Sequence, residues 1–124
     1  MKKPLRIGII GGGKESAVGP AHMAAIRMGG SFKLGPSIFS HIEDLNHASH
    51  DFYGLPWEGH HHDLGGWLDT FKAELDLVAL LTPSIDHSRQ LSEIIGRGIS
   101  VLVEKPVSCG LSEIKAINDA LAQA

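Results

Sequence analysis

Four short runs of apolar residues are spaced along the chain, and each has the length and composition of a β-strand. The third run, Leu-Asp-Leu-Val-Ala-Leu-Leu, is nearly continuous, which is typical of a strand that is covered on both faces. In the second run, Gly35 and Pro36 interrupt the pattern. Because proline cannot donate to a sheet ladder, we expect a local distortion there. The predicted strands are residues 5–10, 33–39, 75–81 and Ser100–Val103.

Between and after these strands, apolar residues recur at the spacing of a helix. Pro20 suits the first turn of a helix, where the missing N–H group costs nothing. Leu91, Ile94 and Ile95 fall on one stripe of another, which Gly98 closes. The predicted helices are residues 21–28, Glu43–Tyr53, 86–97 and 111–121. Strand and helix therefore alternate, which predicts an α/β fold with a parallel sheet and right-handed crossovers.

Composition and charge narrow the class of protein. The chain has 124 residues, of which 43% are hydrophobic and 20% are charged, as expected for one soluble globular domain. A formal net charge of −3 argues against a nucleic acid or an anionic membrane as the main partner. No apolar window approaches the ~18 residues of a membrane span, and no signal peptide is evident. We therefore expect a cytoplasmic protein.

No metal site is predicted. The single cysteine, Cys109, excludes an internal disulfide and a cysteine-rich zinc site. His60, His61 and His62 are adjacent, and three adjacent side chains do not converge on one ion. We interpret this segment as a hydrated loop.

The turn after the first predicted strand is rich in glycine. It reads Gly11-Gly12-Gly13, and Gly19 follows just before the helix, where strand and helix must pack closely. Glycines leave backbone N–H groups open to phosphate oxygens, and a helix N-terminus favours an anion. The spacing is longer than the usual Gly-x-Gly-x-x-Gly of dinucleotide sites. The turn therefore indicates a phosphate site, with a tight turn that binds nothing as the alternative.

The second strand ends at Ser40 and His41, where a dinucleotide site commonly has an acidic residue that binds the ribose 2′-hydroxyl. Without that acid, the choice between NAD and NADP stays open. We favour NAD slightly, because no arginine or lysine follows Ser40 where a 2′-phosphate would need one.

Two more motifs follow the third and fourth strands. The third strand runs into Thr82-Pro83, with His87 shortly after, and the fourth runs into Glu104-Lys105-Pro106. In an open parallel sheet, ligands bind outside the carboxyl ends of the strands. Both motifs are therefore expected to lie beside the glycine turn.

Together, the glycine turn, Thr-Pro-x-x-x-His and Glu-Lys-Pro resemble the Gfo/Idh/MocA family of oxidoreductases over essentially all 124 residues. The resemblance implies a Rossmann-type parallel sheet with helices on both faces, forming an NAD(P)-binding domain at residues 1–124. It implies a catalytic role for Lys105, which would hold and polarise the substrate beside the nicotinamide. A surface lysine paired with Glu104 is the alternative. The cofactor-binding residues implied are Gly11, Gly12, Gly13, Ser40, His41, Thr82, Pro83, His87, Glu104 and Lys105.

Members of this family carry a second, mainly antiparallel β domain with the substrate pocket, the acid–base residues and usually the oligomer interface. The sequence stops at Ala124, so we expect a truncated Rossmann domain that binds cofactor without full catalysis. An exposed sheet edge would favour a homo-oligomer. The first function hypothesis is the cofactor half of an oxidoreductase that acts on a sugar, polyol or related hydroxyl compound. The alternative is a non-catalytic nucleotide-binding or protein-interaction module.

Overall fold

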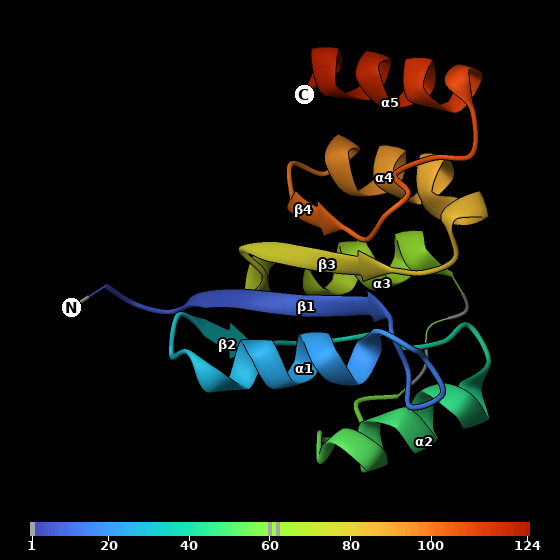
Figure 1. Cartoon of the computed structure of the whole chain (residues 1–124). Coiled ribbons are helices and arrows are strands. Elements are labelled where there is room, and N and C mark those ends of the chain that lie inside the picture. The colour runs from blue at the N-terminus through green and yellow to red at the C-terminus, as the bar shows by residue number, and fades with distance from the viewer. Residues whose placement is uncertain (1, 60, 62) are drawn as a thin grey trace.

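The strands form one parallel sheet at the centre of the chain (Figure 1). The computed structural model describes residues 2–59, 61 and 63–124. Within these residues the sheet order is β2-β1-β3-β4, and every neighbouring pair is parallel. The strands are β1 (Leu5–Gly11), β2 (Phe32–Leu34), β3 (Leu77–Leu81) and β4 (Ser100–Val103). The predicted α/β class and parallel sheet are confirmed.

Helices cover both faces of this sheet. The α-helices are α1 (Gly19–Met28), α2 (Glu43–Tyr53), α3 (Leu64–Phe71), α4 (His87–Gly96) and α5 (Leu111–Gln123), with short 3₁₀ turns η1 (Lys72–Glu74) and η2 (Ser84–Asp86). Figure 1 shows α1 and α3 on opposite sides of the sheet. Four of the α-helices match the predicted ones to within about three residues at each end, as expected for boundaries read from a pattern. Helix α3 was not predicted.

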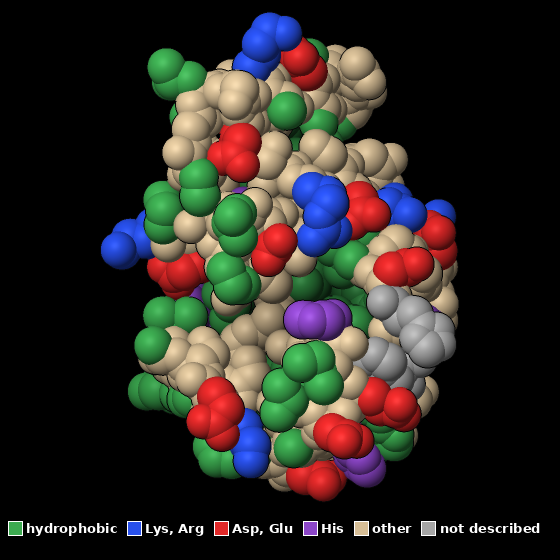
Figure 2. Space-filling view, turned by 90° about the vertical axis from the view of Figure 1, so that its right-hand side faces the viewer, with side chains coloured by type: hydrophobic (Ala, Val, Ile, Leu, Met, Phe, Trp, Pro, Cys, Tyr) green, Lys and Arg blue, Asp and Glu red, His purple; other side chains and the backbone are tan. Residues whose placement is uncertain are grey.

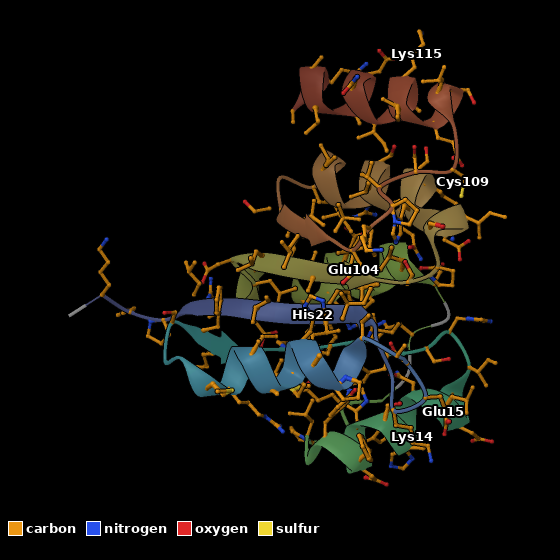
Figure 3. The ribbon with its side chains drawn as sticks, viewed as in Figure 1. Lys14, Glu15, His22, Glu104, Cys109 and Lys115 are labelled. Carbon is orange, nitrogen blue, oxygen red and sulfur yellow. The ribbon has the colours of Figure 1, made fainter. Side chains whose placement is uncertain are left out.

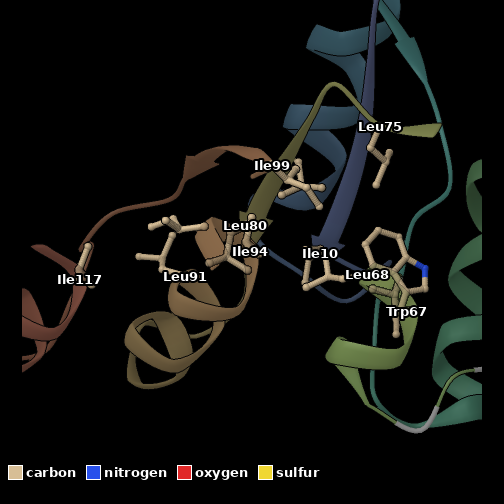
Figure 4. Close-up of a cluster of buried hydrophobic side chains, with 12 residues drawn as sticks. Ile10, Trp67, Leu68, Leu75, Leu80, Leu91, Ile94, Ile99 and Ile117 are labelled. Carbon is tan, nitrogen blue, oxygen red and sulfur yellow. The ribbon is translucent and has the colours of Figure 1, made fainter. Parts of the chain in front are cut away.

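Alternate residues of the strands feed two hydrophobic clusters, as the period of a strand requires. On one face, Ile9 and Ala79 pack with Met23 of α1 and Tyr53 of α2. On the other face the cluster draws on α3, α4 and α5 (Figure 4), and its buried members are Ile10, Ile38, Trp67, Leu68, Leu75, Val78, Leu80, Leu91, Ile94, Ile95, Ile99 and Ile117. Each face of the central strands is therefore part of the core.

The distortion predicted in the second strand is confirmed. Pairing with β1 covers Phe32–Leu34, stops at Gly35, and returns as one bridge between Ile10 and Ile38. In the gap, the backbone N–H of Ile9 donates to the Ser37 hydroxyl oxygen over 3.0 Å, so a side chain replaces the missing ladder partner. The chain that leads to Ser40 is thereby kept alongside β1.

The last strand in the order, β4, forms an edge of the sheet. Leu102 on this strand is 51% exposed, and Leu121 of α5 is 54% exposed. Among the described residues, no helix combines the length and the apolar character needed to cross a membrane.

Candidate functional site

A cleft of about 850 Å³ crosses the carboxyl ends of the strands. It lies where the strand order reverses, since the chain runs from β1 outward to β2 and then returns to β3 on the other side of β1. This switch point is where open α/β sheets bind their ligands. Figure 2 looks onto this end of the molecule and shows a hollow with a hydrophobic floor and charged side chains along its rim.

Most of the residues proposed from the sequence line this cleft. They are Gly11, Gly12, Ser40, His41, Thr82, Pro83, Glu104 and Lys105. Gly13 and His87 are not among the lining residues and lie behind its wall, as described below. The histidine segment is described only at His61, which also lines the cleft, while His60 and His62 lie outside the described residues.

The glycine turn packs directly against the start of α1. Gly11 and Gly12 have φ angles of +81° and +68°, a backbone region that favours glycine. A Cβ atom on Gly19 would overlap the carbonyl oxygen of Gly12 and lie 2.6 Å from its carbonyl carbon. Bare backbone is therefore required on both sides of this contact, and the N-terminus of α1 is brought to the cleft wall.

A serine hydroxyl at that wall accepts the N–H groups of the residue before α1 and of its first residue. The N–H groups of Val18 and Gly19 donate to the hydroxyl oxygen of Ser16 over 3.2 and 3.0 Å, and Ser16 lines the cleft. Because Ser16 accepts both of these N–H groups, the positive end of the helix dipole is what favours an anion beside the turn.

Helix α2 holds the glycine turn from behind. The Tyr53 hydroxyl donates to the Gly12 carbonyl oxygen over 2.8 Å, and the Lys14 N–H donates to the Ser49 hydroxyl oxygen over 3.0 Å. A Cβ atom on Gly13 would lie 2.8 Å from that Ser49 oxygen, so Gly13 is needed for contact with α2. Burial raises the pKa of Tyr53, which keeps the phenol a donor. Sequence reasoning missed Ser49 and Tyr53; their spacing of four residues on one helix face is the only local signal for them.

Substitution of Tyr53 by phenylalanine should loosen this support. The buried Gly12 carbonyl would lose its donor, so we expect the free energy of unfolding to fall by about 0.5–1.5 kcal/mol. Urea unfolding measures this change. Phe52→Leu is the control, because Phe52 is the neighbouring residue on α2 and is 59% exposed. Equal stability of Tyr53→Phe and wild type would show that the hydroxyl does not support the turn.

At the other end of the cleft, His87 contacts the backbone of both Thr82-Pro83 and Glu104-Lys105-Pro106. Its ring is 1% exposed, and its two nitrogens lie 2.9 Å from the carbonyl oxygen of Pro106 and 2.8 Å from that of Thr82. Both partners are acceptors, and a neutral ring donates to only one of them. The Lys105–Pro106 peptide bond is cis. His87 therefore ties the turn after β3 to the turn after β4 from inside the protein.

Glu104 is fixed by a histidine that sequence reasoning missed. The carboxylate oxygen Oε2 lies 2.8 Å from Nε2 of His22 on α1, and Oε1 accepts the backbone N–H of Lys105 over 3.2 Å. Figure 3 shows the His22 and Glu104 side chains pointing toward one another. The two residues are 82 positions apart, so no local pattern could have paired them.

The same contacts lower the pKa of Glu104, the hydrogen bond with His22 first and that with the Lys105 N–H second. A carboxylate with a lowered pKa stabilises the fold above its ordinary pKa of about 4.3, and this stabilisation is lost as pH falls through the folded value. The difference in free energy of unfolding between wild type and Glu104→Gln should therefore be present at pH 6 and shrink below about pH 4.3.

Urea unfolding at a series of pH values tests this prediction. Glu15→Gln serves as control, because the Glu15 side chain is 84% exposed and its nearest cation is 4.0 Å away. A difference between wild type and Glu104→Gln that stays constant from pH 6 to pH 3 would contradict it.

The cleft thus combines an anion-favouring backbone at one end with Lys105 and an oriented carboxylate at the other. The sequence model of the Gfo/Idh/MocA family, described as an oxidoreductase family with an NAD-binding Rossmann fold, matches residues 5–124. A comparison with curated proteins gave no match.

Solved structures share the fold. An oxidoreductase from Sinorhizobium meliloti is 26% identical with a TM-score of 0.87, and the match covers 99% of this chain and 35% of that one. An inositol dehydrogenase homolog from Azotobacter vinelandii, complexed with NAD+, is 21% identical with a TM-score of 0.84, covering 99% and 32%. The WlbA dehydrogenase from Bordetella pertussis, in complex with NADH and UDP-GlcNAcA, is 23% identical with a TM-score of 0.79, covering 97% and 35%.

The chain therefore spans about a third of the length of these proteins. The family match over nearly the whole sequence confirms the resemblance drawn from the glycine turn, Thr82-Pro83 and Glu104-Lys105-Pro106. This chain belongs to the Gfo/Idh/MocA oxidoreductase family, and residues 5–124 form its NAD-binding Rossmann domain.

Proposed function

We propose that the cleft binds a nicotinamide dinucleotide with its pyrophosphate at the glycine turn and its nicotinamide toward Lys105. The observation that carries this proposal is the contact between Gly12 and Gly19, which leaves room for backbone alone where α1 meets the cleft. The adenosine ribose then lies at Ser40 and His41, which line the cleft in the segment that follows β2. A cleft of about 850 Å³ is within the range of small-molecule sites.

The ten residues proposed from the sequence divide into two roles under this proposal. The lining residues contact the dinucleotide, whereas Gly13 and His87 act from behind the wall, Gly13 through α2 and His87 through the Thr82 and Pro106 carbonyl groups. The structures of the Azotobacter homolog with NAD+ and of WlbA with NADH support a dinucleotide as the ligand of this fold.

NAD is the favoured cofactor. The Ser40 hydroxyl oxygen accepts the N–H of Ile42 over 3.1 Å, and its own proton can then be donated to a ribose oxygen. Among the described residues that line the cleft, Lys105 and Arg89 are the arginine and lysine side chains, and both follow β3 or β4 in the chain. Neither comes from the end of β2, where a 2′-phosphate would need a cation.

Bound nicotinamide would supply hydride transfer to or from a substrate carbon. In that reaction, the Lys105 ammonium would stabilise negative charge on the substrate oxygen, since a cation fixed beside a developing alkoxide lowers the barrier. We propose residues 1–124 as the cofactor-binding domain of an oxidoreductase that acts on a sugar, polyol or related hydroxyl compound. The acid–base residues and the substrate pocket would come from a second domain.

Calorimetric titration with NAD+ and NADP+ tests the proposal. We expect saturable binding, tighter for NAD+, and its loss in Gly12→Asp, because the added Cβ atom would lie 2.7 Å from Leu81 and 3.3 Å from Cα of Gly19, at a φ of +68° that favours glycine, and would displace the turn. Gly29→Asp is the charge-matched control, since a side chain there meets open space. Tighter binding of NADP+ would reverse the assignment of cofactor. No binding by the folded chain would overturn the proposal and leave the non-catalytic module as the better interpretation.

A further inference from the structure

We propose that His22 is a positioning residue for the nicotinamide end of the cleft. It holds the Glu104 carboxylate away from the Lys105 ammonium and thereby keeps that ammonium available to a ligand. The inference rests on the proposed binding of a nicotinamide dinucleotide. His22 lies on α1, outside the three motifs of the site.

Both oxygens of the Glu104 carboxylate already have partners. Oε2 lies 2.8 Å from the His22 ring, and Oε1 accepts the backbone N–H of Lys105 over 3.2 Å. The side chains of His22 and Glu104 are 28% and 26% exposed, so the pair is half-buried at the cleft (Figure 3). The carboxylate is therefore held in one orientation by the His22 ring on α1 and by the next backbone N–H in the turn after β4.

The state of the Lys105 ammonium follows from the way the Glu104 carboxylate is held. Among the described residues, no ion pair joins the Lys105 ammonium to Glu104, although the two residues are adjacent in the chain. The carboxylate instead binds the Lys105 backbone, which fixes where the side chain starts. Without His22, Oε2 would lose this partner, and Lys105 is the other cation whose charge acts on the carboxylate, since it contributes to the lowered pKa of Glu104. An ion pair between exposed side chains is weak, so a Glu104–Lys105 pair would lower the attraction of the ammonium for a ligand oxygen by only a few-fold.

His22 also links the two ends of the cleft. It follows Gly19 by three positions on α1, so it lies about one helical turn from the contact with the glycine turn. The helix whose N-terminus faces the pyrophosphate therefore also carries the residue that orients Glu104. A shift of α1 would change both ends together.

The experiment compares two ligands that differ at the nicotinamide end. NADH has the complete dinucleotide, whereas ADP-ribose has the same adenosine, pyrophosphate and second ribose but lacks the nicotinamide ring. We expect His22→Leu to weaken NADH binding by about 3- to 10-fold and to leave ADP-ribose binding within about twofold. His22→Gln keeps a donor for the carboxylate and should recover part of the NADH affinity. His47→Leu is the control, because the His47 side chain is 50% exposed and lies 4.0 Å from its acidic neighbour.

A double-mutant cycle separates positioning from general damage. If His22 acts through Glu104, then His22→Leu in a Glu104→Gln background should cost no further NADH affinity. Circular dichroism confirms that each variant is folded, and His22→Gln carries the test if His22→Leu does not fold. Equal loss of both ligands in the His22 variants, or no loss of either, would overturn the positioning role. Failure of the wild-type chain to bind either ligand would instead overturn the proposed function, and the inference with it.

Discussion

Replacement of Gly19 by alanine should abolish most of the affinity for NAD+. The added Cβ atom would overlap the Gly12 carbonyl oxygen and lie 2.6 Å from the carbonyl carbon and 2.9 Å from Cα of the same residue. All three atoms belong to the backbone, so no side chain can rotate away and α1 must move from the turn. Losing one N–H contact to a charged phosphate costs about 1.5–3 kcal/mol, which is roughly a 10- to 100-fold loss of affinity.

The same change should also destabilise the fold. Alanine improves helix propensity by at most about 1 kcal/mol over glycine, while forcing extra atoms into a packed contact costs about 1–3 kcal/mol. The clash therefore outweighs the gain. Gly29→Ala is the matched control, since it lies at the other end of α1, has a φ of −99°, and would place its Cβ in open space. Calorimetry and urea unfolding measure both effects. Unchanged NAD+ affinity in folded Gly19→Ala would show that the contact does not shape the site.

Truncation of Leu68 to alanine should give one of the largest losses of stability in the chain. Leu68 lies on α3, is 0% exposed, and belongs to the cluster that also contains Trp67, Ile10 and Leu80. Removal of a fully buried leucine side chain leaves a cavity and costs about 2–5 kcal/mol. That cost is a large share of the roughly 5–15 kcal/mol that stabilises a typical domain.

Urea unfolding tests the Leu68 prediction. If only stability has changed, the slope of the free energy of unfolding against urea concentration stays the same. Leu45→Ala makes the same chemical change on α2, where the side chain is 45% exposed, and should cost only about 0.5 kcal/mol. A Leu68→Ala variant that is no less stable than Leu45→Ala would mean that α3 is not an integral part of the core.

Helix α3 shows where reasoning from local pattern fails. Its sequence contains Gly65 and Gly66, and each glycine in a helix costs about 0.8–1.0 kcal/mol relative to alanine. The helix forms because Trp67 and Leu68 are buried against the sheet, a gain that depends on strands distant in the chain. Asp63 adds a cap by accepting the Gly66 N–H over 2.6 Å. An aspartate before the segment was the local signal for this helix.

The candidate site was largely predictable because parallel strands end at one edge of the sheet. Once residues 5–10, 75–81 and Ser100–Val103 are recognised as parallel strands, Gly12, Thr82 and Lys105 must meet. The place of His87 was not predictable in the same way. Its ring contacts two carbonyl groups whose positions depend on the turns after β3 and β4, so it supports the cleft from behind the wall.

The sequence by itself determined the α/β class, the parallel sheet and the family, because hydrophobic period, glycine turns and short motifs are local properties of the chain. The tertiary structure alone decided which side chains support those motifs. Tyr53 reaches Gly12 across 41 positions, and His22 reaches Glu104 across 82. Such contacts leave no periodic trace in the sequence, since a single hydrogen bond between distant residues requires only that the fold bring two polar atoms within about 3 Å.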